Sequence, residues 1–246
     1  MEKKIPARLS RLSLLLKEEG LTRLAQSRVM VLGLGGVGSA CAEALARGGV
    51  GYLILFDGDI IEESNINRQA LAFSSTVGKA KTDVMRAMVK EINPECQVDA
   101  QQIFLTKENI KETLKSFPRP DYVIDCIDTI SQKLEVAAFC QSEKIPLLSS
   151  MGAANKLDPA YLKFSKIENT SYCPMSKIIR LECRRRDIKG LEVLYSNEQP
   201  FKVQDPDGNT KAQTLGSMSY MPPIMGMMLA GKVIRRLAGI EDYKIW

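Results

Sequence analysis

Short apolar runs, separated by amphipathic or polar stretches, set the pattern of this chain. The runs at residues 28–34, 52–56, 122–126 and 145–150 are apolar enough for strands buried on both faces, and residues 96–105 read as a further strand. Helices are predicted within residues 1–26, after the glycines at 33–38, over 76–92 and 107–116, and from 131. Strands that alternate with helices predict an α/β fold with a Rossmann-like, mostly parallel sheet and flanking helices.

The pattern changes after residue 158. Residues 161–167 and 191–195 alternate as short strands, which we expect to be antiparallel C-terminal additions to the sheet, with a helix over 175–186 between them. Residues 205–209 have the composition of a turn, and a Met-rich helix is expected within 216–237 with Pro222 and Pro223 in its first turn. Length allows one large α/β domain or one domain plus an appendage, and we expect one domain over residues 1–246 whose pattern divides it into parts at about 27–157 and about 158–246.

A glycine-rich turn follows the first predicted strand, with glycines at Gly33, Gly35, Gly36 and Gly38. In such a unit, glycine permits a tight turn and a close approach of backbone to phosphate, and free N–H groups at the helix start bind the anion. Asp57 ends the next strand, where a carboxylate is placed to accept hydrogen bonds from a ribose. The unit predicts a nucleotide site without saying which nucleotide, and a nicotinamide dehydrogenase is the default interpretation.

Composition narrows the chemistry. The 246 residues include no histidine, which excludes imidazole bases, Ser–His and Cys–His nucleophile pairs, and His-containing metal sites. No C-x-x-C pair occurs among the six cysteines, which we expect to be reduced core thiols: Cys41, Cys96, Cys126, Cys140, Cys173 and Cys183. The net charge of +5 permits an acidic partner such as RNA. With no secretory start and no run of about 18 apolar residues, we expect a cytoplasmic protein without a membrane partner.

Three charged positions have both a functional and a structural interpretation. Lys79 and Lys81 lie near the start of a helix for which Thr76 is the expected N-cap, so either lysine is near enough to reach a phosphate. Spacing alone favours solvated lysines. Asp128 follows a strand at the same sheet edge as Asp57, where it either holds Mg²⁺ beside phosphates or caps the helix that starts at residue 131.

A basic stretch lies in the C-terminal part. Five cations of the predicted helix suit the phosphates of RNA, although a solvated charged face is the more frequent arrangement: Lys177, Arg180, Arg184, Arg185 and Arg186. The loop at residues 151–155 consists largely of small residues, which allow a substrate to come close.

Together these motifs resemble the ubiquitin-activating-enzyme-like adenylyltransferases, the ThiF/MoeB/HesA superfamily. The carrying motifs are GLGGVGS at 33–39, Asp57-x-Asp59, SNINRQ at 64–69, GKAK at 78–81, INP at 92–94 and DCID at 125–128. Over nearly its whole length, from RLSLLL at 11–16 to YSNE at 195–198, the chain most resembles the branch that dehydrates threonylcarbamoyladenosine in tRNA.

The resemblance implies a site and a reaction. It implies ATP and Mg²⁺, with Asp57 at the ribose, Asn67 and Arg68 at the triphosphate, Lys81 at a phosphate and Asp128 at the metal; Arg68, Lys81 and Asp128 form the catalytic set. The whole implied nucleotide set is Gly33, Gly35, Gly36, Gly38, Ser39, Asp57, Asp59, Asn65, Asn67, Arg68, Gln69, Lys81 and Asp128. The implied reaction is ATP-dependent cyclisation of the threonylcarbamoyl group at position 37 of tRNA through an acyl-adenylate.

The resemblance also implies partners: tRNA, and a second copy of the chain whose site Arg68 reaches. A cysteine desulfurase system is a further candidate partner. Many relatives that activate sulfur carriers have paired cysteines for structural zinc; these are absent, so no zinc is expected. The chain also departs from relatives at Cys173-Pro174, where they often carry an acid before the proline.

Other functions stay open beside this one. An adenylyltransferase for the C-terminal Gly-Gly of a sulfur-carrier protein uses the same chemistry, and the missing zinc cysteines count against it. A nucleotide-binding module without turnover is the alternative from another class, and the intact Arg68, Lys81 and Asp128 argue against that. A dehydrogenase is the third alternative.

Overall fold

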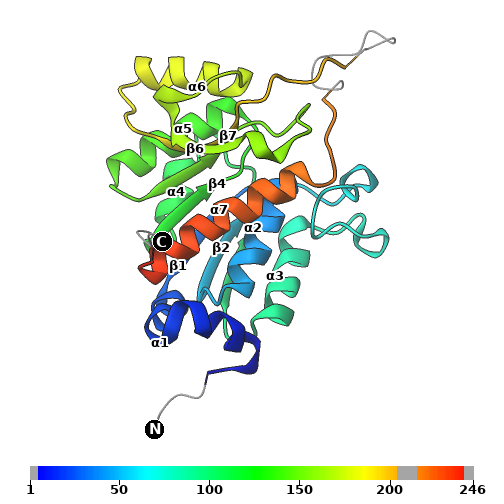
Figure 1. The fold of residues 1–246 in the computed structure, drawn as a ribbon, viewed down its shortest axis with the longest axis vertical. Helices are drawn as coiled ribbons and strands as arrows, with labels where there is room; N and C mark the ends of the chain where they lie inside the picture. Colours follow the sequence, from blue (N-terminus) through cyan, green and yellow to red (C-terminus); the bar gives the residue numbers. More distant parts are fainter. Residues whose placement is uncertain (1–4, 204–214, 241–246) are drawn as a thin grey trace.

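The computed structural model describes residues 5–203 and 215–240. One sheet of seven strands, in the order β3-β2-β1-β4-β5-β7-β6, runs through the molecule (Figure 1). The strands are β1 Arg28–Leu32, β2 Tyr52–Phe56, β3 Gln97–Gln101, β4 Tyr122–Asp125, β5 Leu147–Ser150, β6 Leu162–Lys166 and β7 Glu192–Ser196. The predicted mostly parallel sheet is confirmed, because every neighbouring pair except β6–β7 is parallel.

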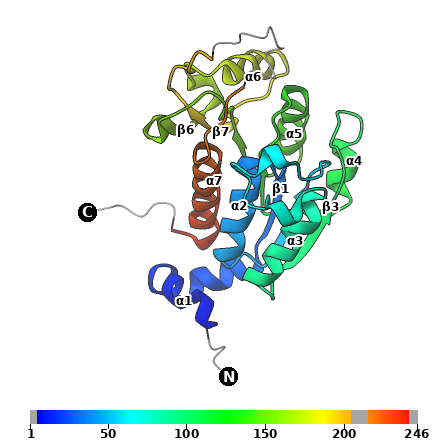
Figure 2. The ribbon, with the colours of Figure 1, turned by 90° about the vertical axis from the view of Figure 1, so that its right-hand side faces the viewer.

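Helices cover both faces of this sheet. They are α1 Ser10–Gln26, α2 Gly36–Arg47, α3 Lys81–Ile92, α4 Ile110–Lys115, α5 Ile130–Ser142, α6 Pro174–Arg185 and α7 Met221–Ala238. Short 3-10 turns occupy Ala7–Leu9, Glu63–Asn65, Ser74–Thr76, Pro159–Tyr161 and Ile167–Asn169. Side chains of α1, α2, α3 and α7 share one core cluster, and those of α4 and α5 belong to a second cluster on the other face (Figure 2).

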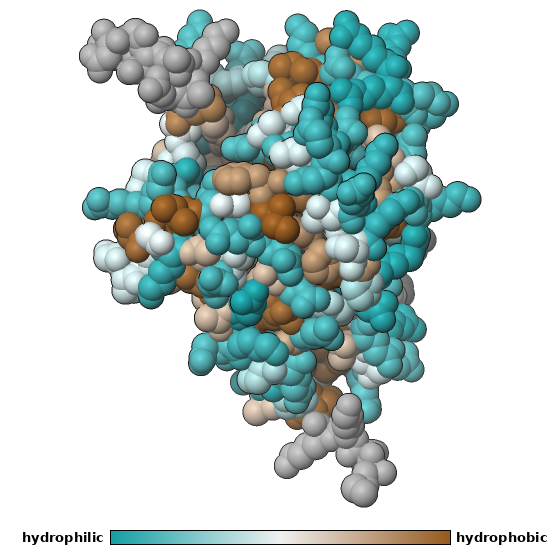
Figure 3. Space-filling model, turned by 180° about the vertical axis from the view of Figure 1, so that it is seen from behind, coloured by the Kyte–Doolittle hydropathy of each residue, from teal (hydrophilic) through white to brown (hydrophobic). Residues whose placement is uncertain are grey.

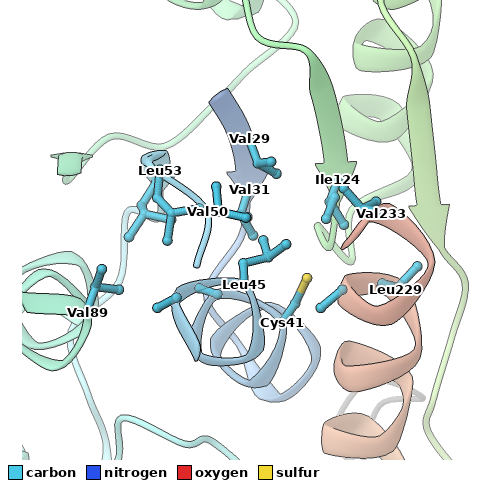
Figure 4. Packing of buried hydrophobic residues seen from close by; sticks show 14 of the residues in the cluster. Val29, Val31, Cys41, Leu45, Val50, Leu53, Val89, Ile124, Leu229 and Val233 are labelled. Carbon is cyan, nitrogen blue, oxygen red and sulfur yellow. The ribbon is translucent and has the colours of Figure 1, made fainter. Parts of the chain in front are cut away.

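The larger core lies between β1, α2 and α7. Figure 4 shows Val29 and Val31 of β1 facing Leu45 of α2, with Leu229 of α7 close by. These four side chains are fully buried, and each contributes about 1.5–3 kcal/mol relative to an exposed position. Packing of α7 against α2 therefore ties the C-terminal part of the chain to the glycine turn at which α2 starts.

The predicted antiparallel strands at the C-terminal end are confirmed, because β6 and β7 pair antiparallel, while β7 also lies parallel to β5. Two other sequence predictions are wrong in detail. Thr76 does not cap α3: it ends a 3-10 turn, and residues 77–79 form a further turn in which Ile61 N donates to Lys79 O at 2.9 Å and Gly78 N donates to Ile61 O at 2.8 Å, so α3 begins only at Lys81. The C-terminal helix starts at Met221, five residues after the expected position, with prolines in its first turn as predicted.

The other predicted elements within the described residues are observed, most of them with shifted ends; the strand expected at 96–105, for example, is β3 Gln97–Gln101. All six cysteines are free thiols, and all except the half-buried Cys126 are buried, as expected. In the part of the chain that the structure describes, no helix is both long and apolar enough to cross a membrane. The face drawn in Figure 3 is mostly hydrophilic, with small separate hydrophobic patches. The turn predicted at residues 205–209 lies outside the described residues.

Candidate nucleotide site

The glycine turn joins β1 to α2 in a conformation that requires glycine at two positions. Gly33 has a φ of +86°, which side chains rarely adopt, and its N–H donates to Phe56 O at 2.8 Å. A Cβ on Gly38 would lie 1.8 Å from Gly33 O. At Gly35, in contrast, an added Cβ would meet no heavy atom within 4 Å. The turn is therefore tightly packed at Gly33 and Gly38 and has free space at Gly35, beside the start of α2. This is the arrangement expected for a phosphate site.

Asp57 is bonded to this turn. Its Oδ2 accepts from Leu34 N at 2.6 Å, and its Oδ1 accepts from Asp59 N at 2.8 Å. Burial raises the pKa of the Asp57 carboxyl, and nearby Lys81 together with the two backbone N–H donors opposes that increase. The carboxylate thus fixes the end of β2 against the glycine turn, on the edge where the sequence placed it.

Lys81 is buried between two carboxylates. Its Nζ lies 2.7 Å from Asp59 Oδ2 and 3.9 Å from Asp57 Oδ1. The Lys81 side chain is 6% exposed, whereas that of Asp59 is 53% exposed, so the cluster opens to solvent on the Asp59 side. The solvated interpretation is therefore wrong for Lys81, while Lys79 is indeed exposed. The pairing of residues 59–61 with 78–81 holds Lys81 here, because Lys81 N also donates to Asp59 O.

The loop that contains Asn65 to Gln69 lies beside the start of α2. Arg68 Nη1 donates to Ser64 O at 2.9 Å and to Asn67 Oδ1 at 2.8 Å, so the arginine is held within its own loop. Asn65 and Gln69 are buried, and the Gln69 Oε1 atom is buried without a hydrogen-bond partner.

Two contacts attach this loop to its neighbours. Ser39 Oγ accepts from Ala70 N at 3.0 Å and donates to Gly35 O at 2.7 Å, which joins the loop to the glycine turn. Asn67 Nδ2 donates to Ser217 O at 3.2 Å, across 150 positions of the chain. The polar residues of the loop thus combine internal hydrogen bonds with contacts to the glycine turn and to the segment before α7.

Asp128 is exposed at the edge of the sheet, just beyond β4. Its Oδ1 accepts from Thr129 Oγ1 at 3.3 Å, and Thr129, not Asp128, occupies the N-cap position of α5. The capping alternative for Asp128 is therefore wrong. No group of three or more acidic, Cys or His side chains lies together among residues 5–203 and 215–240, so any divalent ion here would take much of its coordination from phosphate and water.

Sequence reasoning missed the buried partner of this loop. Asp125 is fully buried and accepts from Lys133 Nζ at 2.8 Å, from Ser149 Oγ at 2.6 Å and from Ile127 N at 3.0 Å. The sequence does contain a sign of these partners, because Asp125 is an acid within an apolar strand and a buried acid needs hydrogen-bonding or charged partners. Asp125 therefore holds the loop that presents Asp128.

A second group that was missed follows β5. Lys156 is 2% exposed, donates to Glu198 O, and has its pKa lowered mainly by burial. The Glu198 carboxylate accepts from Leu157 N at 3.0 Å and from Asp158 N at 3.3 Å. These contacts tie the loop of small residues after β5 to the segment after β7.

The basic side chains of α6 are less available to bind RNA than the sequence suggests. Arg180 donates to Thr170 O at 2.7 Å, and Arg186 pairs with Glu135 at 2.8 Å. Arg185 pairs with Glu182 at 2.6 Å. Lys177 and Arg184 are exposed. The helix begins at Pro174 with Cys173 at its N-cap, where the sulfur accepts from Ser176 N at 3.5 Å.

Comparison with known proteins places this site in a family. The model of the ThiF family matches residues 7–245. The chain belongs to the ThiF family. The match spans the nucleotide-binding part and the C-terminal part alike, so the glycine turn, the Asp57–Lys81–Asp59 cluster and α7 all lie within the ThiF match.

Individual relatives are similar over almost their full length. The chain is 40% identical to a tRNA threonylcarbamoyladenosine dehydratase of Bacillus subtilis, over 96% of each protein, and 40% identical to one of Haemophilus influenzae, over 89% of this chain and 88% of the relative. The crystal structure of the Escherichia coli tRNA N6-threonylcarbamoyladenosine dehydratase in complex with ATP superposes with a TM-score of 0.84 at 30% identity, over 94% of each chain.

Proposed function

We propose that this ThiF-family protein is an ATP-dependent tRNA threonylcarbamoyladenosine dehydratase. The observation that carries the proposal is its similarity to such a dehydratase over 96% of both chains. The geometry agrees with that activity: a glycine turn, a buried lysine and two carboxylates meet at one edge of the sheet, where α/β proteins bind nucleotides. We further propose a single adenylation domain over residues 1–246, with its nucleotide-binding part at about 27–157 and its substrate-facing part at about 158–246.

The residues present fit ATP. The open position at Gly35 and the start of α2 receive phosphates, and Asp57 accepts hydrogen bonds from the ribose through the lone pairs that its backbone donors leave free. Asn67 and Arg68 contact the triphosphate from the adjacent loop. Lys81, already paired with Asp59, turns toward a phosphate when the nucleotide supplies a stronger negative charge.

The residues also fit Mg²⁺. Asp128 offers one exposed carboxylate, and Mg²⁺ is commonly bound by one or two carboxylates together with substrate phosphates and waters. When bound, the ion would neutralise charge on the phosphates and polarise them. Asp128 is assigned to hold it.

The chain's own groups then account for the chemistry. The carboxylate of the threonylcarbamoyl group attacks the α-phosphorus of ATP, pyrophosphate leaves, and Arg68 and Lys81 stabilise the negative charge that develops. The ureido oxygen or nitrogen of the same side chain attacks the activated carbonyl and expels AMP, which carries away one oxygen of the former carboxylate. Because the second nucleophile belongs to the same molecule, positioning supplies most of the rate, and neither histidine nor a catalytic cysteine is required.

We further propose that the protein acts as a homodimer in which Arg68 serves the partner's site. Arg68 is half-buried and bonds only to its own loop among the described residues, through Ser64 and Asn67, and both contacts are exposed. An arginine held so loosely is able to exchange these neutral acceptors for a phosphate, with which it forms stronger, charge-assisted hydrogen bonds.

The test follows the oxygen atoms of the threonylcarbamoyl carboxylate into the products. The protein is incubated with ATP, Mg²⁺ and tRNA whose threonylcarbamoyl carboxylate carries ¹⁸O, and the released AMP is analysed by mass spectrometry. The proposal predicts AMP with one ¹⁸O atom and an equal amount of pyrophosphate, both dependent on the modified tRNA. Release of pyrophosphate only with a Gly-Gly carrier protein would instead establish a sulfur-carrier adenylyltransferase, and ATP binding without release would establish a binding module.

A further inference from the structure

Three exposed aromatic side chains lie on segments that meet beside the nucleotide site: Tyr161, Phe201 and Tyr220, here called the aromatic lip. They are 45%, 58% and 38% exposed. Hydrogen bonds join their segments, because Tyr220 Oη donates to Leu157 O at 2.7 Å and Asn197 N donates to Tyr161 O at 3.1 Å. Aromatic rings exposed on adjoining segments differ from single apolar residues scattered over a surface, which need no explanation.

One residue holds the lip together. Asn155 accepts from Phe201 N at 2.8 Å through its backbone oxygen and from Gly216 N at 2.7 Å through Oδ1, and its own N–H donates to Gly216 O at 2.9 Å. Its φ of +55° belongs to the left-handed region, which asparagine adopts more readily than most residues. Asn155 therefore fixes the segment after β7 and the segment before α7 to the loop that follows β5.

The lip is also connected to the phosphate end of the site. Ser217, one residue beyond Gly216, accepts from Asn67 Nδ2. Pro222, two residues beyond Tyr220, packs so closely on the glycine turn that a Cβ on Gly36 would lie 2.7 Å from Pro222 Cβ. In Figure 1 this segment descends toward α7 on the side of the loop at residues 60–80. The segment that carries Tyr220 therefore borders the site where the nucleotide phosphates are assigned.

Two exposed lysines, Lys163 and Lys202, lie beside the lip, and Lys163 Nζ lies 3.2 Å from the side-chain amide of Asn197, whose other amide atom lies 3.0 Å from Tyr161 O. The two acids nearest in sequence are fixed in place by backbone hydrogen bonds, since Glu198 accepts from Leu157 N and Asp158 accepts from Ala160 N at 2.8 Å. Exposed aromatic rings interleaved with lysines are the surface on which unstacked bases and their phosphates bind.

From this geometry we propose that the aromatic lip binds the single-stranded RNA loop that carries the modified adenosine, by stacking bases on Phe201 and Tyr220. The inference rests on the proposed function. Enzymes that modify a base act on single-stranded nucleic acid or draw the base out of its stack, and bases that lose a stacking neighbour bind aromatic side chains in its place. The lip offers replacement stacking at that border, whereas three of the five α6 cations are held by internal contacts.

The experiment uses the full-length protein and an anticodon stem-loop RNA that carries threonylcarbamoyladenosine. Phe201→Ala and Tyr220→Ala are each expected to raise the KM for this RNA on the order of tenfold, with kcat changed less than threefold, because stacking on one ring contributes to binding and not to the transition state. Tyr220→Phe keeps the ring but loses the hydrogen bond to Leu157 O, so a smaller rise in KM than in Tyr220→Ala assigns the difference to stacking. Leu15→Ala removes a more exposed apolar side chain, 75% exposed on α1, and serves as the control for surface truncation.

Three results would overturn the inference. An unchanged KM in both alanine variants while the wild type dehydrates the RNA would exclude stacking on the lip. A conversion of dimer to monomer in these variants, measured by light scattering, would show that the lip is a contact between copies of the chain. An equal loss in Leu15→Ala would show a general effect of surface truncation. Failure of the proposed function is distinct, because the wild type itself would then leave the RNA unchanged.

A second experiment measures how much the two lysines beside the lip contribute to RNA binding through their charge. The Lys163→Ala, Lys202→Ala double variant should weaken RNA binding and reduce the slope of log affinity against log salt by about 1.4, since each of two single-strand phosphate contacts contributes roughly 0.7. An unchanged slope would place the RNA phosphates away from the lip and contradict the proposal.

Discussion

Asp125 and Lys133 form an ion pair of 2.8 Å between Oδ2 and Nζ in which neither side chain is more than 1% exposed. The pair joins β4 to α5 directly beneath the loop that presents Asp128. Removing one partner of a buried pair leaves an uncompensated charge, which is far more costly than removing both.

We therefore expect Lys133→Met to lower the free energy of unfolding by about 3–5 kcal/mol. Urea denaturation measures this value. Lys115→Met, which breaks the exposed 2.8 Å pair with Glu143, is the control and should change stability by less than about 1 kcal/mol. Adding Asp125→Leu to Lys133→Met should recover part of the loss. Equal effects of Lys133→Met and Lys115→Met would mean that the Asp125–Lys133 pair has no special energetic role.

The two lysines of the GKAK motif provide a matched pair for catalysis. Lys81→Met should reduce turnover by about 10²- to 10³-fold, because it removes a buried cation assigned to the phosphates, whereas exposed Lys79→Met should retain activity within about twofold. Steady-state AMP release from ATP and modified tRNA measures both. Comparable rates in the two variants would remove Lys81 from the site.

Arg68 acting in trans has a mixing test. Arg68→Ala and Lys81→Ala proteins are each expected to be nearly inactive, but after dissociation and reassociation the mixture should recover roughly a quarter of the wild-type rate, since half the dimers are mixed and each has one intact site. A mixture that stays inactive, with dimers confirmed by light scattering, would place Arg68 in the site of its own subunit.

Alanine substitutions in the glycine turn should separate folding from ligand binding. Gly38→Ala puts a Cβ 1.8 Å from Gly33 O and is expected to prevent stable folding, whereas Gly35→Ala meets nothing within 4 Å and should fold normally. If phosphates approach at Gly35, its variant should nevertheless bind ATP more weakly, as calorimetry would measure. Wild-type ATP affinity in a folded Gly35→Ala protein would contradict the assigned phosphate position.

A pH dependence follows from Glu192. Burial of its carboxyl opposes ionisation, but hydrogen bonds from Arg236 and Lys232 outweigh burial and hold the pKa below its ordinary 4.5. Because the folded-state pKa is the lower one, the contribution to stability is present above pH 4.5 and is lost as the pH falls through the folded-state value.

Glu192→Gln should therefore cost about 1–3 kcal/mol at neutral pH, and its difference from the wild type should shrink in acid. Urea titrations at several pH values measure the difference. Glu95→Gln, at a 75% exposed partner of Arg8, is the control and should show little change at any pH. A constant difference between Glu192→Gln and wild type down to strongly acidic pH would contradict the assignment.

The local pattern of apolar and polar residues was sufficient to predict the strands and the glycine turn. Strands β1, β2 and β4 are apolar runs, which predict buried strands without knowledge of the neighbouring strands. The glycine turn and Asp57 were found because both belong to a single strand–helix–strand unit, which sets their spacing. The position and direction of each strand in the sheet were harder to predict from the sequence. The direction of β7, for example, depends on its partner β5, over 40 residues earlier.

Contacts between distant segments explain the other errors. Thr76 looks like a helix cap, but a turn at residues 77–79, held by pairing with Ile60 and Ile61, delays the start of α3 to Lys81. The same pairing buries Lys81, which no pattern within its own helix would reveal. Asn155 and the aromatic lip were missed for a related reason, since Tyr161, Phe201 and Tyr220 are far apart in sequence and their segments are joined by backbone and side-chain hydrogen bonds between distant positions.

The most direct test of the account is mass spectrometry of nucleosides from tRNA that carries threonylcarbamoyladenosine, after incubation with this protein, Mg²⁺ and ATP, beside a reaction without ATP. The account predicts that the modified nucleoside loses the mass of one water only when ATP is present. An unchanged nucleoside in the presence of ATP, from protein that is folded and binds ATP, would contradict it.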